Sequence, residues 1–318
     1  MVLIRRSPKI TTFFTWLLIS CIPIGVSAKV VDKSVKKSAG KTLAKMGPSL
    51  LWGGCGITKK AFMTEMAKSY LEDTGVEIIL QGGGATKGIR GVAKGALNIG
   101  GACRSSMEFS SAERYVKQYP VAWDAIVFIV NKNNPLDSIT IQQVRDIYNG
   151  KITNWKQLGG ANARIDLYAR KSAISGVGLT LRELVFYDTE KDFYKGTRYV
   201  KSSGPAEKAV LKSVRAFTAT GVSSANRRDV KILKVGGKAP TYANIKSGQY
   251  ILYRPIYLVT KMGEKNHMVL DFLKYVQGEK GKEVIRKAGT VPYTDALHLL
   301  GKQYRQNLKA YRASLNKN

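Results

Sequence analysis

The sequence predicts an α/β protein of two lobes, each built on a mostly parallel sheet flanked by helices. Its 318 residues correspond to about two domains of roughly 150 residues. Short β-rich runs alternate with amphipathic helices, which is typical of parallel sheets. Two apolar β runs, residues 125–131 and 250–260, fit chain crossovers between the lobes. We therefore assign residues 48–124 and 259–318 to lobe 1 and residues 125–258 to lobe 2.

The first 28 residues have the features of an export signal. Arg5 and Lys9 contribute to a basic start, residues 10–24 are apolar, and the small residues that follow fit cleavage after Ala28. An alternative stays open, because Cys21 ends a stretch that resembles a bacterial lipobox and would then be lipidated. Both interpretations place the protein outside the cytoplasm, in the periplasm or secreted. The apolar stretch is too short for a membrane-spanning helix.

The chain is strongly basic. It has 52 Lys and Arg against 22 Asp and Glu, a net charge of +30, and residues 1–28 hold only three of the basic residues and none of the acidic ones, which leaves +27. Residues 29–47 contain six lysines and one acid, and their low hydrophobicity predicts a flexible segment. The other basic residues are dispersed, without the arginine and aromatic clustering of surfaces that read bases. This pattern argues against nucleic-acid binding and favours a basic exterior among anionic envelope polymers.

The first predicted unit is a strand at residues 50–52, a glycine-rich turn and a helix. The helix carries Phe62 and Tyr70 on one stripe, and Gly75 fits its end. Thr58 is a good candidate for its N-cap.

Two more glycine-rich strand ends follow in lobe 1. A strand at residues 76–80 leads through a turn at 81–88 into a helix that carries Ile89. A strand at residues 96–99 ends in a loop at 100–106. Three strand ends in this lobe therefore present glycines or hydroxyl groups.

Lobe 2 repeats this arrangement. Thr140 and Gln143 form a capping box at the start of a helix, and a strand is expected at residues 165–169. The polar, basic loop at residues 170–177 then opens another helix. The remaining expected elements are, in order, a helix opened by Gly204 and Pro205, a buried strand at 217–222 and a helix at 268–276 that returns to lobe 1.

This arrangement predicts an anion site between the lobes. The first turn of a helix leaves N–H donors unsatisfied and carries a partial positive charge, so it binds a tetrahedral oxyanion well. Glycine lets the backbone approach closely, and Ser or Thr adds a hydroxyl donor. Each charge-assisted hydrogen bond contributes about 1.5–3 kcal/mol. After the costs of desolvation and ordering are subtracted, half a dozen such bonds would leave a binding free energy of roughly 8 kcal/mol, which corresponds to micromolar affinity. Such a site needs no catalytic group.

Six strings of the sequence also carry a family resemblance. They are GCGIT at 54–58, GGGATKGI at 82–89, GALNIGGACR at 95–104, DAIVFIVN at 124–131, GKITNW at 150–155 and YRPIY at 253–257. In this order, from about residue 50 to about residue 295, the chain resembles the periplasmic phosphate-binding proteins of ABC importers. Those proteins belong to the type II periplasmic binding protein superfamily.

The resemblance implies a periplasmic-binding-protein-like fold with two hinge crossovers. It further implies a monomeric binding protein, not an enzyme, that uses no cofactor or metal, closes over phosphate or a related oxyanion, and delivers it to the membrane permease of an ABC importer. The ligand positions that it implies are Thr58 in the first loop, Ala85 and Thr86 in the second, Arg104 in the third, and Ser175 and Gly176 at the helix entrance of lobe 2.

The sequence departs from the family pattern at several of these loops. Ala85 and Val177 stand where hydroxyl residues are usual, and Cys103 stands where a serine is common. The arginine that the family places four residues before the loop serine falls here on Lys171, with Arg170 one residue earlier, so either side chain is expected to reach the anion. We therefore expect an altered anion preference or weaker phosphate binding.

Several of the selected residues also have simpler explanations. Thr58, Thr86 and Ser175 fit helix caps, and Arg104 and Arg170 fit solvated or carboxylate-paired cations.

Cys55 and Cys103 are the only cysteines after residue 28. The fold that the resemblance implies places them at neighbouring strand ends, so we expect a disulfide in an oxidising compartment, with two free thiols as the alternative.

Two other classes of function remain to be weighed. An enzyme acting on phosphate esters would need a nucleophile with a base or metal-binding carboxylates, and the predicted loops contain no Asp, Glu or His. His267 and His298 are expected at the surface. The stronger alternative is a non-transport interaction protein of the same fold, which binds an anionic polymer or a membrane surface through its lysines.

Overall fold

The computed structural model describes residues 47–107 and 109–315. The predicted cleavage site after Ala28, the alternative lipidation site Cys21 and residues 29–46 of the predicted flexible segment lie outside the described residues. Within the described part of the chain, no helix combines the length and the apolar character that crossing a membrane requires.

Three parallel strands, in the order β2-β1-β3, form the lobe 1 end of a continuous ten-stranded sheet. The helical path after β1 runs from α2 through the π-helical segment η1 into α3, and it ends as predicted at Gly75, which has a φ of 71°. Glycine suits this left-handed conformation because it has no Cβ. The elements are β1 (Ser49–Gly54), α2 (Gly56–Thr58), η1 (Lys59–Met63), α3 (Thr64–Thr74), β2 (Glu77–Gln81), α4 (Ala85–Ala93), β3 (Ile99–Ala102) and η2 (Ser111–Glu113).

The sheet of lobe 2 has the parallel strands β8, β6 and β7. The predicted capping box is present at α5, where the Gln143 N–H donates to Thr140 Oγ1 and the Thr140 N–H donates to Gln143 Oε1. The elements are β5 (Ser138–Ile139), α5 (Ile141–Tyr148), η3 (Trp155–Leu158), β6 (Asp166–Arg170), α6 (Gly176–Leu181), η4 (Arg182–Phe186), β7 (Arg198–Val200), α7 (Ser203–Lys212), β8 (Ala216–Gly221), α8 (Val222–Ala225), β9 (Lys231–Ile232), β10 (Lys234–Val235) and α9 (Tyr242–Lys246).

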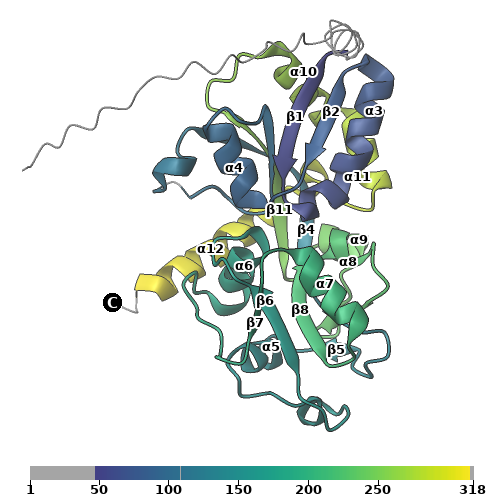
Figure 1. Cartoon of the computed structure of the whole chain (residues 1–318), viewed down its shortest axis with the longest axis vertical. Coiled ribbons are helices and arrows are strands. Elements are labelled where there is room, and N and C mark those ends of the chain that lie inside the picture. Colours follow the sequence, from purple (N-terminus) through teal and green to yellow (C-terminus); the bar gives the residue numbers. More distant parts are fainter. Residues whose placement is uncertain (1–46, 108, 316–318) are drawn as a thin grey trace, which may run out of the picture. The chain divides into compact units, whose positions relative to one another are not determined.

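Two long strands connect the lobes, β4 (Val116–Val130) and β11 (Tyr253–Lys261). Residues 116–125 of β4 pair antiparallel with β11, and residues 126–129 pair antiparallel with β8. Figure 1 shows both strands passing from one group of helices to the other. These strands are the two expected crossovers, although β4 begins well before residue 125. The remaining elements are α10 (His267–Gln277), α11 (Glu279–Lys287), β12 (Val291–Pro292), η5 (Tyr293–Ala296) and α12 (Leu299–Leu315).

The strand expected at residues 96–99 lies further along the chain, because β3 begins at Ile99 and contains the two glycines assigned to a loop. Both Ala96 and Leu97 donate their N–H groups to the carbonyl of Gly91 and so close the turn after α4. The glycines are needed inside the strand, because a Cβ at Gly101 would overlap the indole ring of buried Trp52. Close packing therefore explains a sequence that reads locally as a turn.

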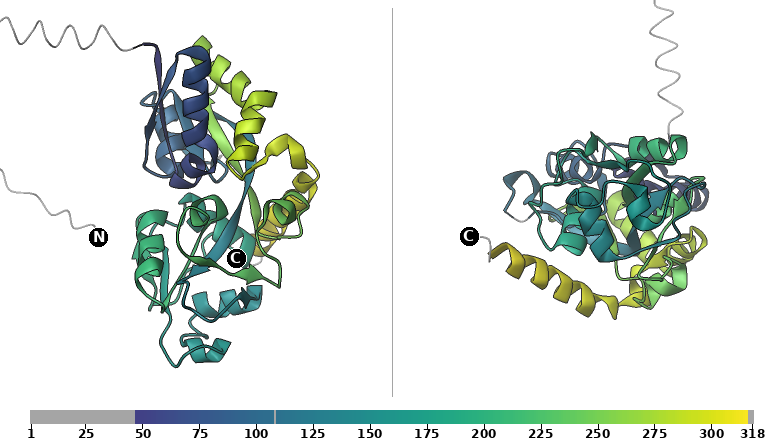
Figure 2. Two further views of the ribbon diagram at one scale, coloured as in Figure 1. Left: turned by 90° about the vertical axis from the view of Figure 1, so that its right-hand side faces the viewer. Right: turned by 90° about the horizontal axis from the view of Figure 1, so that it is seen from below.

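The carboxyl-terminal helix α12 was not expected from the sequence. It packs against η4, and Lys302 Nζ donates to the carbonyl of Gly248 at 3.4 Å. Figure 2 shows this helix, in yellow, extending along the outside of the other described elements. The division of the chain into residues 48–124 plus 259–318 and residues 125–258 stays a prediction.

Candidate functional site

The loops selected from the sequence meet between the two lobes. The hydroxyl of Thr86, at the start of α4, donates to the carbonyl of Ile174 just before α6, over 3.3 Å. The Thr180 hydroxyl of α6 donates to the carbonyl of Cys103 over 3.4 Å. Gly176 lies so close to the Cys103 side chain that a Cβ at position 176 would overlap its sulfur, and that Cβ would lie 3.3 Å from the Cβ of Ala85. The second and third loops of lobe 1 and the start of α6 thus form one interface.

The first loop differs from the expectation, because Thr58 is not the N-cap. Cys55 occupies that position, and its Sγ accepts a hydrogen bond from the Thr58 N–H at 3.3 Å. The helix begins at Gly56, separated from the end of β1 only by Cys55, so Thr58 falls in its first turn. The Thr58 hydroxyl lies 2.9 Å from the same sulfur and is fully buried. The N–H and the hydroxyl of Thr58 are therefore both within hydrogen-bond distance of the Cys55 sulfur.

The other two expected caps have different outcomes. Ser175 is the N-cap of α6, where its Oγ accepts from the Gly178 N–H at 3.1 Å. Thr86 is not a cap, because the N-cap of α4 is Gly84, with a φ of 91°. Val177 is buried in the first turn of α6, where it contributes no hydroxyl donor.

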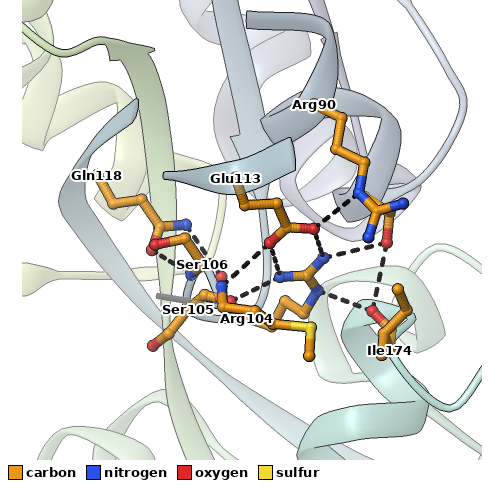
Figure 3. Close-up of polar contacts among 9 residues, drawn as sticks. Arg90, Arg104, Ser105, Ser106, Glu113, Gln118 and Ile174 are labelled. Carbon is orange, nitrogen blue, oxygen red and sulfur yellow. Dashed lines mark hydrogen bonds and ion pairs between the residues drawn. The ribbon is translucent and has the colours of Figure 1, made fainter. Parts of the chain in front are cut away.

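Arg104 forms a network with Glu113 that the sequence did not reveal. The guanidinium donates from Nη1 and Nη2 to the two carboxylate oxygens, both at 2.8 Å, and from Nε to the carbonyl of Ile174 at 2.7 Å. Figure 3 shows Glu113 between Arg104 and Arg90, with Ile174 on the opposite side of Arg104. Both side chains of this ion pair are fully buried. Arg104 therefore joins the lobes and already has its own carboxylate.

This network makes Glu113 important for stability. Burial alone would raise the pKa of its carboxyl, but hydrogen bonds from Arg104, the Met107 N–H and Arg90 outweigh burial and lower it. We expect Glu113→Gln to lower the free energy of unfolding by about 2 kcal/mol at pH 7, because the remaining amide accepts more weakly and leaves a buried cation without its counterion.

The pH dependence of this loss follows from the direction of the shift. A carboxyl with a lowered folded pKa stabilises the protein above its unfolded pKa of about 4.3 and loses that effect as the pH falls through the folded value. Urea unfolding at pH 7 and at pH 3 should therefore show a smaller difference between the variant and the unmodified protein at pH 3. Glu65→Gln, which removes an exposed pair with Lys68, is the control. Equal losses for both variants would contradict the assignment.

Arg170 has a different environment from Arg104. It lies at the end of β6 with 4% of its surface exposed, and it donates to the Ser202 carbonyl at 3.0 Å and to Ser203 Oγ at 2.6 Å. Within the described residues no carboxylate oxygen lies within 4 Å of its nitrogens. Burial lowers the pKa of Arg170 to about 10, so it stays positively charged at neutral pH. The neighbouring Lys171 is exposed.

The buried pair of Arg254 and Asp124 was not selected from the sequence as part of the site. These residues are directly opposite each other on β11 and β4, and Arg254 Nη2 lies 3.2 Å from Asp124 Oδ2. Arg254 Nη1 donates at 3.1 Å to the carbonyls of both Cys103 and Gly176. Asp124 directly precedes the crossover expected at 125–131, and Arg254 lies within the one expected at 250–260. These charges next to apolar runs were the available signal for the pair, which joins both lobes at the hinge.

A second ionic contact between the lobes was also missed. Lys60, on the first helix, donates at 2.8 Å to Ser224 Oγ and lies 3.4 Å from the fully buried carboxylate of Glu207 on α7. Arg228 also pairs with Glu207, with its Nε 3.0 Å from Oε2 of the carboxylate.

The expected disulfide is not formed in the structure. Cys55 and Cys103 are free, buried thiols. The sulfur of Cys55 acts instead as the acceptor that caps the first helix.

A small polar cavity continues the interface on the side of Arg104. Its volume is about 40 Å³, enough for ordered water, and burial raises the pKa of Glu183 in its wall. Within residues 47–107 and 109–315 no group of three or more His, Cys, Asp or Glu side chains is placed to hold a metal ion. The lining residues are Cys103, Arg104, Ser105, Thr180, Glu183, Leu184, Tyr253, Arg254, Pro255, Tyr257 and Gln303.

Known proteins with similar sequences have names that refer to phosphate. The chain is 25% identical over 266 residues to the phosphate-binding protein PstS of Bacillus subtilis, which covers 83% of this chain and 87% of that relative. It is 24% identical over 244 residues to the phosphate-binding protein PstS of Borreliella burgdorferi, which covers 74% of this chain and 87% of that relative.

A solved structure extends this similarity to the fold. It is a putative phosphate ABC transporter substrate-binding protein with bound phosphate from Clostridium perfringens, with a TM-score of 0.69 and 27% identity. The match covers 77% of this chain and 99% of that one. A family model described as a PBP superfamily domain matches residues 51–280. Since this match spans most of the chain, including both sheets and both crossovers, the protein belongs to the PBP superfamily.

Proposed function

We propose that this protein binds phosphate or a related oxyanion between its two lobes and delivers it to an ABC importer for uptake or sensing. It would act outside the cytoplasm as a monomer, and as a binding protein rather than an enzyme. The names of the relatives from Bacillus subtilis and Borreliella burgdorferi support phosphate as the ligand, as does the phosphate in the related structure from Clostridium perfringens. The export signal predicted before Ala28 supports the location.

The observation that carries this proposal is the buried, carboxylate-free guanidinium of Arg170 beside the start of α6. Arg170 lies close to the first turn of α6, because its Cβ is 3.1 Å from the position that a Cβ on Gly178 would take. Ser175 is the N-cap of the same turn. A buried cation without a counterion is costly, and an oxyanion would supply the missing charge. The positive end of α6 favours the same ligand.

The other residues suggest how the affinity and selectivity differ from the usual family pattern. Ala85 and Val177 offer no hydroxyl, the Thr58 donors are engaged by Cys55, and Arg104 is neutralised by Glu113. Arg170 and the backbone N–H groups at the start of α6 would therefore supply most of the binding. Fewer donors imply weaker binding of phosphate, or a preference for another oxyanion.

Calorimetric titration of the protein lacking residues 1–28 tests the proposal. Phosphate, arsenate, sulfate and a phosphonate are titrated separately, each with and without a reducing agent. We expect saturable binding of at least one oxyanion, with a dissociation constant in or above the micromolar range. An absence of binding for all four anions under both conditions would overturn the proposal.

The charge of +27 after residue 28 favours a second candidate function, contact with an anionic polymer or membrane surface. Binding of that kind should weaken steeply as salt is raised, because it releases condensed counterions. An enclosed oxyanion site is screened much less. Titrations at about 50 mM and 300 mM salt with an anionic polymer and with the preferred oxyanion therefore separate the two functions.

A further inference from the structure

Cys55 and Cys103 lie side by side at the ends of two paired strands. β1 and β3 are parallel, with Gly54 opposite Gly101, and each cysteine follows its strand by one residue. Their exposed fractions are 5% and 1%, and both are free thiols. The Cys55 N–H donates to the carbonyl of Gly101, two residues before Cys103, at 3.1 Å. The pair is therefore placed to form a bond after a small displacement, since a disulfide needs the sulfurs about 2.05 Å apart.

The sulfur of Cys55 occupies the donors that an oxyanion would use in the first loop. It accepts from the Thr58 N–H at 3.3 Å and lies 2.9 Å from Thr58 Oγ1. The helix that starts here continues through residues 56–74, so its first turn favours a negative charge. Burial would raise the pKa of Cys55, but the neighbouring Cys103, hydrogen bonds from Thr58 and the charge of Arg254 outweigh burial and lower it. These surroundings therefore favour the thiolate form of Cys55.

Cys103 is the protonated member of the pair. The neighbouring Cys55 and burial raise the pKa of Cys103 well above the usual value, so Cys103 stays a thiol. The reduced pair therefore carries one negative charge, located at the first loop of the interface.

From this geometry, and resting on the proposed function, we propose that the two cysteines form a reversible disulfide that controls the anion site. In the reduced protein, the Cys55 sulfur acts as an internal anion that holds the N–H and hydroxyl of Thr58. When the disulfide forms, the sulfur becomes neutral and a poor acceptor, and these two donors become available to the oxyanion. Oxidation therefore strengthens oxyanion binding.

The oxidant for this step is a small-molecule or protein disulfide. The Cys55 thiolate attacks one sulfur of the oxidant, forms a mixed disulfide and releases a thiolate. Cys103 then loses its proton and attacks the Cys55 sulfur, which forms the Cys55–Cys103 bond and releases the second thiol of the reagent. Two protein thiols are oxidised and one disulfide is reduced to two thiols. Because Cys103 packs against Gly176, the reagent reaches the pair when the two lobes separate.

Other charged groups that act on the pair come from β11, β4 and β6. Arg254 and Asp124 pair with each other, and Arg170, whose pKa is lowered by burial, also interacts electrostatically with Cys103. None of these groups is formed or consumed by the thiol–disulfide change. The difference in anion affinity between the two redox states therefore follows from the Cys55 charge.

The experiment compares phosphate affinity in four samples of the protein lacking residues 1–28. The unmodified protein and Cys55→Ser are each titrated with phosphate after reduction by a phosphine and after oxidation by oxidised glutathione, at pH 6.0 and pH 8.5. Mass spectrometry after alkylation reports the state of the thiols. We expect the oxidised unmodified protein to bind at least about tenfold more tightly than the reduced one at pH 8.5, a change of about 1.4 kcal/mol.

The pH dependence and the variant make the test specific. At pH 6.0 Cys55 is protonated, so the difference between reduced and oxidised protein should shrink. Cys55→Ser keeps a capping side chain and should bind equally under both conditions. Equal affinity of the reduced and oxidised unmodified protein, or failure to form the disulfide, would overturn this inference. An absence of binding in every sample would instead overturn the proposed function, and the alkylation result would still report whether the pair forms.

Discussion

Replacing Arg254 by methionine should lower the free energy of unfolding by about 3–5 kcal/mol, because it leaves the carboxylate of Asp124 buried without its counterion. Asp124 is fully buried, and Arg254 is 3% exposed. After the substitution, Asp124 would keep the hydrogen bond that the Ser223 N–H donates to its Oδ1 at 3.2 Å. The carbonyls of Cys103 and Gly176 would lose their shared donor. Urea unfolding followed by circular dichroism measures the loss.

A double variant separates the effect of charge from that of packing. Arg254→Met combined with Asp124→Asn removes both charges and keeps an acceptor for the Ser223 N–H. It should recover a large part of the stability lost in the single variant, because an uncharged buried pair avoids the desolvation of a lone carboxylate. If both variants were equally unstable, packing around the arginine would explain the loss and the ionic argument would be wrong.

Replacing Arg170 by methionine should raise the dissociation constant for the preferred oxyanion by about 10- to 150-fold, which corresponds to about 1.5–3 kcal/mol for one charge-assisted hydrogen bond. Its effect on stability should be small. The variant loses hydrogen bonds to Ser202 and Ser203 but also removes a buried charge that has no carboxylate within 4 Å among the described residues. Calorimetric titration of the oxidised protein measures the binding, and urea unfolding measures the stability.

Lys171→Met is the matched control for this substitution. Lys171 is the next residue and is exposed, and the sequence alone did not decide between the two basic side chains. The control should change the dissociation constant less than about threefold, because an exposed charge is screened by water and salt. If Arg170→Met bound the anion as well as the unmodified protein, or if Lys171→Met had the larger effect, the assignment of Arg170 would be wrong.

Much of the local structure could be predicted because its signals lie within a few residues of one another. The capping box of Thr140 and Gln143 spans three positions and is present, and the end of the first helix at Gly75 follows from the conformational freedom of glycine. Assigning Gly100 and Gly101 to a loop was wrong, because the groups that require them, the Gly88 backbone for Gly100 and the Trp52 ring for Gly101, lie outside the local sequence.

The sequence predicted which residue types lie in the loops of the site, but not which side chains they contact. Arg104 was expected to face an anion, whereas Glu113, nine positions later across a loop, already neutralises it. Thr58 was expected to cap a helix, and Cys55 takes that position. Neither outcome has a periodic signal in the sequence, because each depends on where a turn places one side chain.

The sequence by itself determined the α/β class, the two crossovers and the loops that meet between the lobes, since strand and helix periodicity and glycine-rich turns are local properties of the chain. Only the tertiary structure decided which cations have counterions. Asp124 and Arg254 are 130 positions apart and become neighbours through the antiparallel register of β4 and β11, while Arg170 stays without a carboxylate within 4 Å in the described chain. The electrostatic state of a buried group depends on its spatial neighbours, and long-range strand pairing selects those neighbours.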